Sequence, residues 1–206
     1  MRCPAVTGAV LAGGRSRRMG SDKGLLRIGS RRIIEVVLGA IRVLFPEIVI
    51  VANEPSVYDG LGVPVVPDRI PGKGPLGGIH AALCASGSPH TFCVACDMPL
   101  VNPDVVAHLC ALAPGYDVVV PAVEAGYEPL HAVYGQSCLP RVERMVREAR
   151  LRVDELFSAV RVRCVDADEL RRLDPSLRSF MNVNTPNELE AARQTLEHAG
   201  DARCGS

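Results

Sequence analysis

The sequence predicts an α/β protein in which a mostly parallel sheet is covered by helices on both faces. Short apolar runs, several of them rich in Val and Ile, alternate with segments of helical periodicity along most of the 206 residues. Strands that lack a polar face must be buried on both sides, which is typical of parallel sheets. No internal repeat or linker-like stretch divides the chain, so we expect one domain over residues 1–206.

The strands are predicted at short apolar runs bounded by turn residues: Ala5–Leu11, Ile48–Ala52, Pro64–Val66, Thr91–Ala95, Val118–Val120, Leu130–Tyr134 and Val160–Val165. The helices are predicted where apolar residues recur at helical spacing: Arg32–Phe45, Gly78–Ala85, Pro103–Leu112, Leu139–Ala149, Val153–Ala159 and a last helix that begins at Thr185.

Two of the helices carry start signals. Asn102 can cap a helix that has Pro103 in its first turn. Thr185 and Glu188 have the spacing of a capping box, in which each side chain accepts a hydrogen bond from a free backbone N–H group. The stretch after His198 is rich in Gly, Ala and charged residues, and we expect it to fray.

The charges of the chain balance, with 23 basic and 23 acidic residues. We therefore expect no nucleic-acid or membrane partner, because no net field attracts the chain to either. No apolar run reaches the ~20 residues that a bilayer span needs. The N-terminus lacks the apolar segment of a signal peptide, so we expect a cytoplasmic protein. The basic excess is local and lies between Arg15 and Arg32.

Two short patterns imitate metal sites. Cys93 and Cys96 have the spacing of a zinc or redox motif, but a strand places residues three apart on opposite faces. No second pair completes such a site, so core packing is favoured. Asp166 and Asp168 imitate the Asp-x-Asp motif of glycosyltransferases. Their position between a late strand and an Arg-rich helix favours a solvated turn instead.

The segment Leu11–Lys23, LAGGRSRRMGSDK, predicts a phosphate-binding loop directly after the first strand. Gly13 and Gly14 allow positive φ, which lets their N–H groups approach a pyrophosphate closely. The loop lacks both the Gly-Lys-Ser/Thr of a P-loop and the G-x-G-x-x-G of a dinucleotide-binding fold. Its positively charged side chains include Arg15, Arg18 and Lys23.

This string resembles the signature L-A-G/A-G-x-S-x-R-M-G-x-D-K of nucleotidyltransferases, and most closely that of the molybdenum cofactor guanylyltransferases. The resemblance implies a Rossmann-like three-layer sandwich with a mostly parallel mixed sheet, as in nucleotide-diphospho-sugar transferases. It implies that Lys23 and Arg18 act in catalysis. It also implies a set of nucleotide-binding residues in this loop: Leu11, Ala12, Gly13, Gly14, Arg15 and Lys23.

Asp97 follows an apolar strand and precedes Met98-Pro99. A carboxylate at that point can enter the crevice beyond the carboxyl ends of a parallel sheet, and Mg²⁺ prefers hard oxygen ligands of this kind. The string CDMP resembles the metal-binding aspartate motif of the same family. We therefore expect Asp97 to bind Mg²⁺ and to act in catalysis; the alternative is a turn-forming Asp near Pro.

The glycine-rich run 72–78 precedes a predicted helix, where backbone N–H groups can bind an anion. It resembles the G-P-L-x-G-I segment of the family, so we expect Gly74 and Gly78 to contact the nucleotide, although a flexible loop would have the same composition. Asn53 and Asp68 each follow a predicted strand. The resemblance makes both nucleotide contacts, and guanine offers donors that amide and carboxylate oxygens accept. Either could instead be an ordinary turn former.

The resemblance divides the chain into a nucleotide-binding half, at about residues 1–100, and an acceptor half, at about 101–198. In the acceptor half, the segments 128–134 and 182–186 match family patterns, as does Arg152-Val153. These segments are expected to line the region that receives a pterin substrate. Asn182 and Asn184 are candidate site residues, Asn184 for a second metal or phosphate contact.

The implied reaction joins GMP from GTP to the phosphate of molybdopterin and releases pyrophosphate. The acceptor phosphate is already anionic, so positioning and charge neutralisation suffice without a general base. Alternatives are a cytidylyltransferase acting on the same pterin, a sugar-phosphate nucleotidyltransferase and a nucleotide-binding module without catalysis. The glycines at 13 and 14 and the Gly-Pro-Leu string favour guanine. We also expect transient contacts with molybdoenzymes or their chaperones, and a monomer or weak homo-oligomer.

Overall fold

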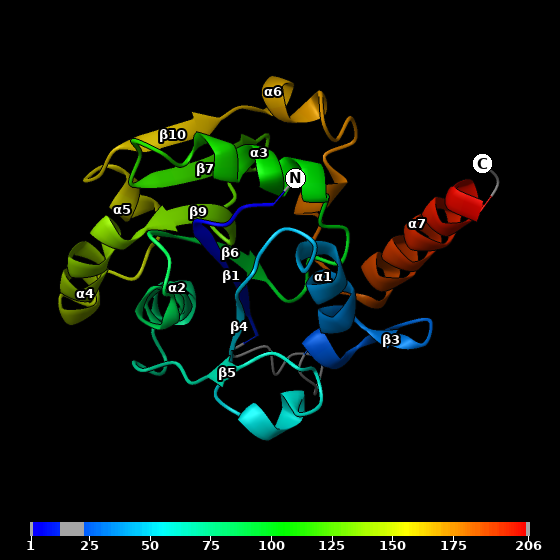
Figure 1. The fold of residues 1–206 in the computed structure, drawn as a ribbon, viewed down its shortest axis with the longest axis horizontal. Coiled ribbons are helices and arrows are strands. Elements are labelled where there is room, and N and C mark those ends of the chain that lie inside the picture. Colours follow the sequence, from blue (N-terminus) through cyan, green and yellow to red (C-terminus); the bar gives the residue numbers. More distant parts are fainter. Residues whose placement is uncertain (1, 13–22, 205–206) are drawn as a thin grey trace.

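The computed structural model describes residues 2–12 and 23–204 of the chain. In this part of the chain, an eight-stranded sheet forms the centre of the molecule (Figure 1). A short hairpin of two further strands, β2 (Arg27–Ile28) and β3 (Arg31–Arg32), lies apart from it. The strands of the large sheet are β1 (Val6–Leu11), β4 (Ile48–Val51), β5 (Val65–Val66), β6 (His90–Ala95), β7 (Val118–Val123), β8 (Gly126–Tyr127), β9 (His131–Gly135) and β10 (Val162–Val165).

The strand order is β10-β7-β9-β6-β1-β4-β5, with β8 paired to β7. Strands β6, β1, β4 and β5 run parallel to one another. Strand β9 is antiparallel to both β6 and β7, and β10 is parallel to β7. The sheet is therefore mixed and mostly parallel, which confirms the predicted fold class.

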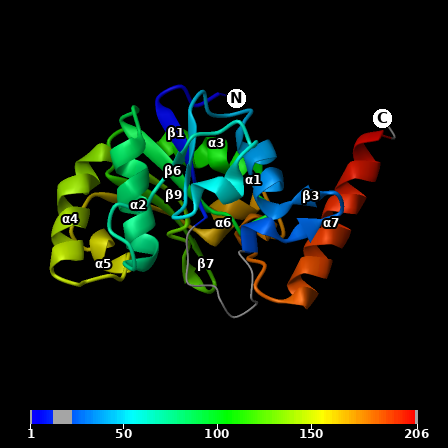
Figure 2. The same cartoon turned by 90° about the horizontal axis from the view of Figure 1, so that it is seen from below.

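Helices cover both faces of the sheet (Figure 2). Helices α2 (Gly74–Ala85), α4 (Leu139–Arg147) and α5 (Asp154–Phe157) pack on one face, around buried residues such as Leu76 and Val142. The other face carries α1 (Ile33–Ile41), α3 (Pro103–Leu112), α6 (Ala167–Arg171) and α7 (Pro186–Cys204). The sheet thus has an apolar core on each face, and helices cover both cores, which gives three layers.

The predicted capping signals are confirmed. The Asn102 side chain accepts a hydrogen bond from the backbone N–H of Asp104 at the start of α3. The Glu188 carboxylate accepts from the backbone N–H of Thr185, and the Thr185 hydroxyl accepts from that of Glu188. Helix α7 continues to Cys204, past His198, after which we expected fraying.

Several predicted bounds were wrong. Helix α2 begins at Gly74 instead of Gly78. Pro75 has the φ of a first helical turn, whereas the surrounding glycines are typical of a loop and moved the predicted start to Gly78. Helix α1 ends at Ile41 instead of Phe45, since Pro46 disfavours the helical conformation in the residue before it. The short strands β2, β3 and β8 were missed because none of them consists of a run of apolar residues.

The patterns that imitate metal sites have structural roles. Cys93 and Cys96 are buried in different cores on opposite faces of the sheet, as predicted. The Asp166 side chain caps α6 by accepting from the backbone N–H of Glu169 at 2.9 Å, so it lies at a helix start and not in a free turn. In the described part of the chain, no helix has both the length and the apolar character of a membrane span.

Candidate functional site

The carboxyl ends of four adjacent parallel strands bring the predicted polar residues to one edge of the sheet. Leu11, Val51, Val66 and Ala95 form a single row across β1, β4, β5 and β6. Asn53, Asp68 and Asp97 each follow a member of that row by two residues. Gly13 has the same offset from Leu11 in sequence. Three predicted site residues therefore share one edge, at the point where the Leu11–Lys23 loop leaves β1.

The backbone holds the start of that loop firmly. The Leu11 carbonyl accepts from Cys96 N at 3.1 Å, and Ala12 N donates to the Val51 carbonyl at 2.9 Å. The hydroxyl of buried Tyr58, from the short 3₁₀ helix Pro55–Tyr58, donates to the Ala12 carbonyl at 3.3 Å. The Leu11 and Ala12 side chains are buried, so only their backbone could meet a ligand.

Most of the predicted loop residues fall outside the described part of the chain. These are Gly13, Gly14, Arg15 and Arg18. The backbone of Lys23 begins a 3₁₀ helix, Lys23–Leu25. The roles expected for these residues stay predictions.

Asp68 and Asn53 are joined to each other. The Asn53 Oδ1 atom accepts from Asp68 N at 3.1 Å, and Asp68 Oδ1 accepts from Ile70 N at 2.9 Å. A Cβ built on Gly77 would lie 2.9 Å from Asp68 Oδ2. The carboxylate therefore lies against the first turns of α2, where the helix dipole favours a negative charge. Asn53 thus positions Asp68, in addition to any ligand contact of its own.

The glycines of the 72–78 run have different roles. Gly74 has a φ of +61°, a conformation that favours glycine. A Cβ on Gly78 would lie 3.3 Å from the Leu11 side chain, so Gly78 lets α2 pack closely on the end of β1. Gly77, which leaves room for Asp68, was not among the predicted site residues. The Gly77-Gly78 pair inside a helix is visible in the sequence. The sequence alone does not show which of the two glycines faces a carboxylate.

Asp97 meets a segment from the far end of the chain. Val183 N donates to the Asp97 carbonyl at 2.8 Å, which brings Asn182 and Asn184 beside the end of β6. Within residues 2–12 and 23–204, no three His, Cys, Asp or Glu side chains gather as a metal cluster. The oxygen-bearing side chains on the segments that meet here are the Asp97 carboxylate and the amides of Asn182 and Asn184. Hard oxygen donors of this kind fit Mg²⁺, which binds one or two carboxylates together with substrate phosphates.

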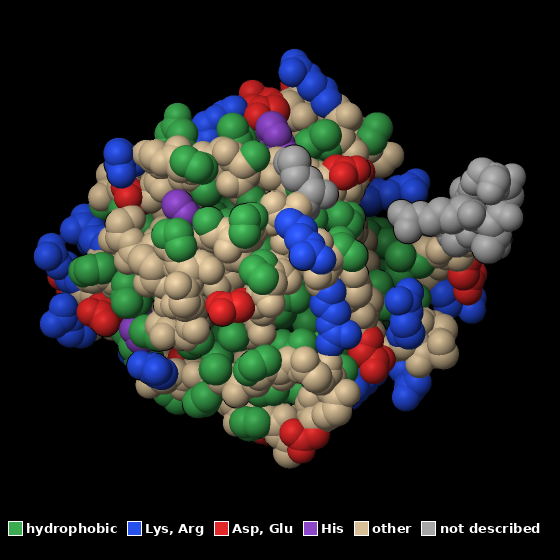
Figure 3. All heavy atoms as spheres, viewed as in Figure 1, with side chains coloured by type: hydrophobic (Ala, Val, Ile, Leu, Met, Phe, Trp, Pro, Cys, Tyr) green, Lys and Arg blue, Asp and Glu red, His purple; other side chains and the backbone are tan. Residues whose placement is uncertain are grey.

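On the face shown in Figure 3, charge is spread rather than concentrated. Lys and Arg side chains lie over α4 on the left, at the top, and near α1 and β3 from the centre toward the right, with acidic and apolar groups between them. With 23 basic and 23 acidic residues, positive charge for a phosphate ligand must be local. In the sequence, the basic segment from Arg15 to Lys23 follows β1 after three residues.

Comparison with known proteins gives a consistent family. The model of the MobA-like NTP transferase domain matches residues 8–161. A probable molybdenum cofactor guanylyltransferase from Pelotomaculum thermopropionicum is 41% identical over 197 residues, which cover 96% of either chain. A molybdenum cofactor guanylyltransferase from Desulfosudis oleivorans is 37% identical over 195 residues, 94% of this chain and 96% of that one.

A solved structure agrees in fold. Molybdopterin-guanine dinucleotide biosynthesis protein A from Archaeoglobus fulgidus superposes with a TM-score of 0.81 and 30% identity. The match covers 93% of this chain and 99% of that one. The family match begins within β1 and includes the strand ends that carry Asn53, Asp68 and Asp97. The chain therefore belongs to the family of nucleotidyltransferases with a MobA-like NTP transferase domain.

Proposed function

We propose that this protein transfers GMP from GTP to the phosphate of molybdopterin. An oxygen of the acceptor phosphate bonds to the α-phosphorus of GTP, the bond from that phosphorus to the bridging oxygen breaks, and pyrophosphate leaves. The observation that carries the proposal is the single edge at which Asn53, Asp68 and Asp97 follow one row of parallel strands. The names of the close relatives support the choice of substrates.

On this proposal, the chain's own groups bind and orient both substrates. The backbone N–H groups of the glycine pair and the cations of the Leu11–Lys23 loop hold the triphosphate. Asp68 and Asn53 offer oxygen acceptors to guanine. Asp97, with the amide oxygens of Asn182 and Asn184, would hold Mg²⁺. When bound, a divalent ion neutralises charge at the phosphates.

Positioning accounts for the catalysis on this proposal. The nucleophile is an anion, so no residue has to remove a proton from it. Two negatively charged groups must instead be brought into contact, and cations at the edge of the sheet reduce that repulsion. The cytoplasmic location, the oligomeric state and the contacts with molybdoenzymes stay predictions.

A competition experiment tests the proposal. The protein is given GTP, CTP and ATP with Mg²⁺ and molybdopterin, and pyrophosphate release and the dinucleotide product are measured. We expect GTP to be preferred over CTP by about 10²-fold in kcat/KM, since two unpaired buried groups cost about 1–3 kcal/mol each. Equal use of CTP would indicate a cytidylyltransferase. Binding of GTP without pyrophosphate release would indicate a non-catalytic module. A parallel reaction contains a sugar phosphate in place of molybdopterin, and turnover in that reaction alone would indicate a sugar-phosphate nucleotidyltransferase.

A further inference from the structure

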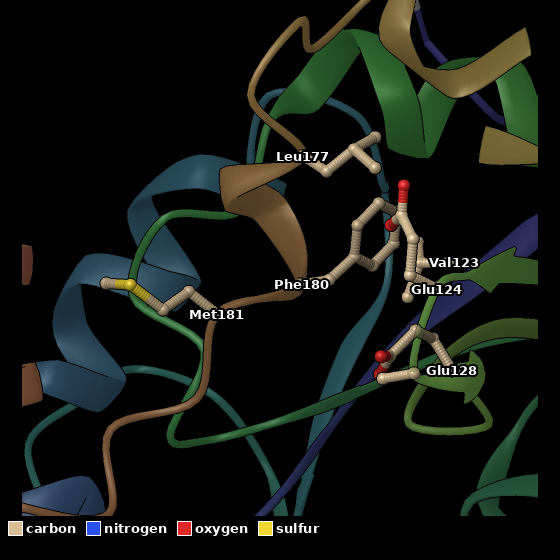
Figure 4. A pocket seen from close by; sticks show the side chains of 7 residues that line it. Val123, Glu124, Glu128, Leu177, Phe180 and Met181 are labelled. Carbon is tan, nitrogen blue, oxygen red and sulfur yellow. The ribbon is translucent and has the colours of Figure 1, made fainter. Parts of the chain in front are cut away.

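A hollow of about 290 Å³ lies at the carboxyl end of β7. One wall is the β7–β8 hairpin and the other is the segment 174–183, which we call the strap. Figure 4 shows the Phe180 ring and the Glu124 and Glu128 side chains converging on the space between these walls. The lining residues are Val123, Glu124, Ala125, Glu128, Leu177, Phe180 and Met181.

Backbone hydrogen bonds tie both walls to the end of β6. Ala95 N donates to the Leu130 carbonyl at 3.0 Å, just after Glu128, and Val183 N donates to the Asp97 carbonyl at 2.8 Å, just after Met181. In the sheet order, β9 and β7 lie on one side of β6, and β1, β4 and β5 lie on the other. The hollow and the Asn53–Asp68 pair therefore lie on opposite sides of Asp97.

The strap is held in place by buried polar contacts. The carboxylate of buried Asp174 accepts from the backbone N–H and the hydroxyl of Ser179, both at 2.8 Å. The Ser179 hydroxyl accepts from Asn102 N at 3.1 Å. Leu177 has a φ of +50°, which is unusual for a residue other than glycine. Such strain is maintained only where the surroundings fix it, so the wall that carries Phe180 is preorganised.

The two carboxylates in the hollow differ in their partners. Glu124 forms an ion pair with Arg171. The Glu128 carboxylate has no hydrogen-bond partner among the side chains and backbone groups of residues 2–12 and 23–204. Glu128 is half-buried, and burial raises the pKa of its carboxyl. A carboxylate that loses water needs compensating donors, and a ligand in the hollow can supply them.

We propose that Glu128 selects the acceptor substrate by accepting two hydrogen bonds from the 2-amino-4-oxopyrimidine edge of a flat bicyclic ring that lies against Phe180. The inference rests on the proposed function, which makes a pterin the acceptor. The ring N3–H and the exocyclic amine are parallel donors, and a carboxylate accepts one with each oxygen. The ring face packs on an aromatic side chain. The acceptor then extends from the hollow toward Asp97, with its phosphate at the reacting edge.

Guanine presents the same donor pair, so the experiment must separate acceptor binding from nucleotide binding. The probes are pterin and lumazine, in which a carbonyl replaces the 2-amino group. A carboxylate that faces this carbonyl loses a donor and meets a like partial charge. We measure both affinities by fluorescence titration without GTP, for the wild-type protein, Glu128→Gln and Glu190→Gln. Glu190 is exposed on α7 and pairs with Arg193, so it serves as the matched control.

The wild-type protein should bind pterin at least ~10-fold more tightly than lumazine, because a site built for a donor rejects an analogue without it. Glu128→Gln should bind pterin ~10-fold or more weakly and lose most of this preference, because the amide replaces one acceptor by a donor. Glu190→Gln should retain both affinities. In turnover with GTP and molybdopterin, Glu128→Gln should raise KM for the acceptor and leave KM for GTP within about twofold.

Unchanged pterin affinity and preference in Glu128→Gln would overturn the proposal, as would a loss of GTP affinity with pterin binding intact. The second result would place guanine, not pterin, in the hollow. The outcome for the proposed function is read separately, from pyrophosphate release by the wild-type protein. If the wild-type protein turns over molybdopterin and Glu128→Gln matches it in both titrations, only the role of Glu128 fails. If wild-type turnover is absent, the titrations still decide whether Glu128 selects this ring edge.

Discussion

The two sides of Asp97 are built in different ways. On the nucleotide side, formed by the ends of β1, β4 and β5, the polar residues follow parallel strands at one constant offset. On the acceptor side, the walls are the β7–β8 hairpin and the strap, which are about 50 residues apart in the chain. The first side is repetitive in its geometry, and the second depends on contacts between distant segments.

This difference follows from what each side is proposed to bind. A triphosphate is met by backbone N–H groups and cations, which any chain can supply at a glycine-rich strand end. A ring edge is distinguished by individual side chains on fixed walls. The comparison predicts that a substitution on one side alters KM for one substrate only. Asp97 lies between the two sides, so its substitution should affect the step in which both substrates react.

The largest expected effect is that of Asp97→Ala. The substitution removes a carboxylate from the meeting point of the two sides, and loss of a principal charge-stabilising group lowers kcat by about 10²–10³. The contact that holds the strap uses the Asp97 carbonyl, which the variant retains. The Tm of the variant should therefore stay close to that of the wild type, while its single-turnover rate falls.

A variant of Asp97 that keeps more than half of the wild-type rate in saturating Mg²⁺ would contradict its role as metal ligand. Asp104→Ala is a suitable control, because Asp104 lies in the first turn of α3 and its side chain plays no part in the proposed site. It should leave kcat within about twofold.

A smaller effect is expected from Asp68→Ala, and it should be confined to the nucleotide side. Removing an acceptor for guanine should reduce the preference for GTP over CTP by about tenfold, since one unpaired group accounts for about 1–3 kcal/mol. Asn53→Ala should reduce it less, because Asn53 acts partly by holding Asp68 N. Competition assays measure the ratio directly. A fall in acceptor affinity with an unchanged ratio would show that Asp68 belongs to the other side.

The nucleotide side could largely be predicted from sequence. Apolar runs that end in Asn53, Asp68 or Asp97 have visible boundaries, and parallel strands carry their ends to one edge. The geometry within that edge could not be predicted. That Gly78 packs on Leu11, while Gly77 leaves room for Asp68, depends on the rotation of α2 about its axis.

The acceptor side could be predicted only as a region. Segments 128–134 and 182–186 were expected there, but Phe180 and Leu177 were not, because nothing local marks them as one wall. Their position depends on the buried Asp174–Ser179 contact with the start of α3, which joins residues more than 70 positions apart. Tertiary contacts of this kind leave no periodic signal in the sequence.

The acceptor side should lose stability in acid because of one buried histidine. His131, on β9, is fully buried between the rings of Phe92 and Phe180, with centroids at 5.3 and 4.9 Å. Burial lowers its pKa to about 3, and the nearby charge of Asp174 opposes that shift. The folded state therefore binds fewer protons than the unfolded state, in which the pKa is about 6.5. The free energy of unfolding should therefore reach its full value above the unfolded pKa of about 6.5 and fall as the pH drops toward 3.

At pH 5 the loss relative to pH 7 should be about 2 kcal/mol, from 1.4 kcal/mol per pH unit below the unfolded pKa. Urea unfolding at the two pH values measures it. His131→Leu should lose less stability between them, whereas His198→Leu, which changes an exposed histidine on α7, should behave like the wild type. An unchanged pH difference in His131→Leu would contradict the prediction.

The smallest expected effects come from two tyrosines that occupy matching places on the two sides. The Tyr58 hydroxyl donates to the Ala12 carbonyl at 3.3 Å, where the nucleotide loop begins, and the Tyr134 hydroxyl donates to the Pro129 carbonyl at 2.7 Å, beside Glu128. Both rings are buried. Each Tyr→Phe substitution removes the hydrogen bond to that carbonyl, worth about 0.5–1.5 kcal/mol, and leaves the ring in place.

Tyr58→Phe should therefore raise KM for GTP by about two- to tenfold and leave KM for the acceptor unchanged, and Tyr134→Phe should do the reverse. Steady-state kinetics with each substrate varied in turn measures the four values, and thermal unfolding of both variants controls for general destabilisation. A loss of stability alone would lower the amount of active protein and leave both KM values as they are. If each variant instead changed both KM values equally, the two sides would not be positioned independently, and the division at Asp97 would be wrong.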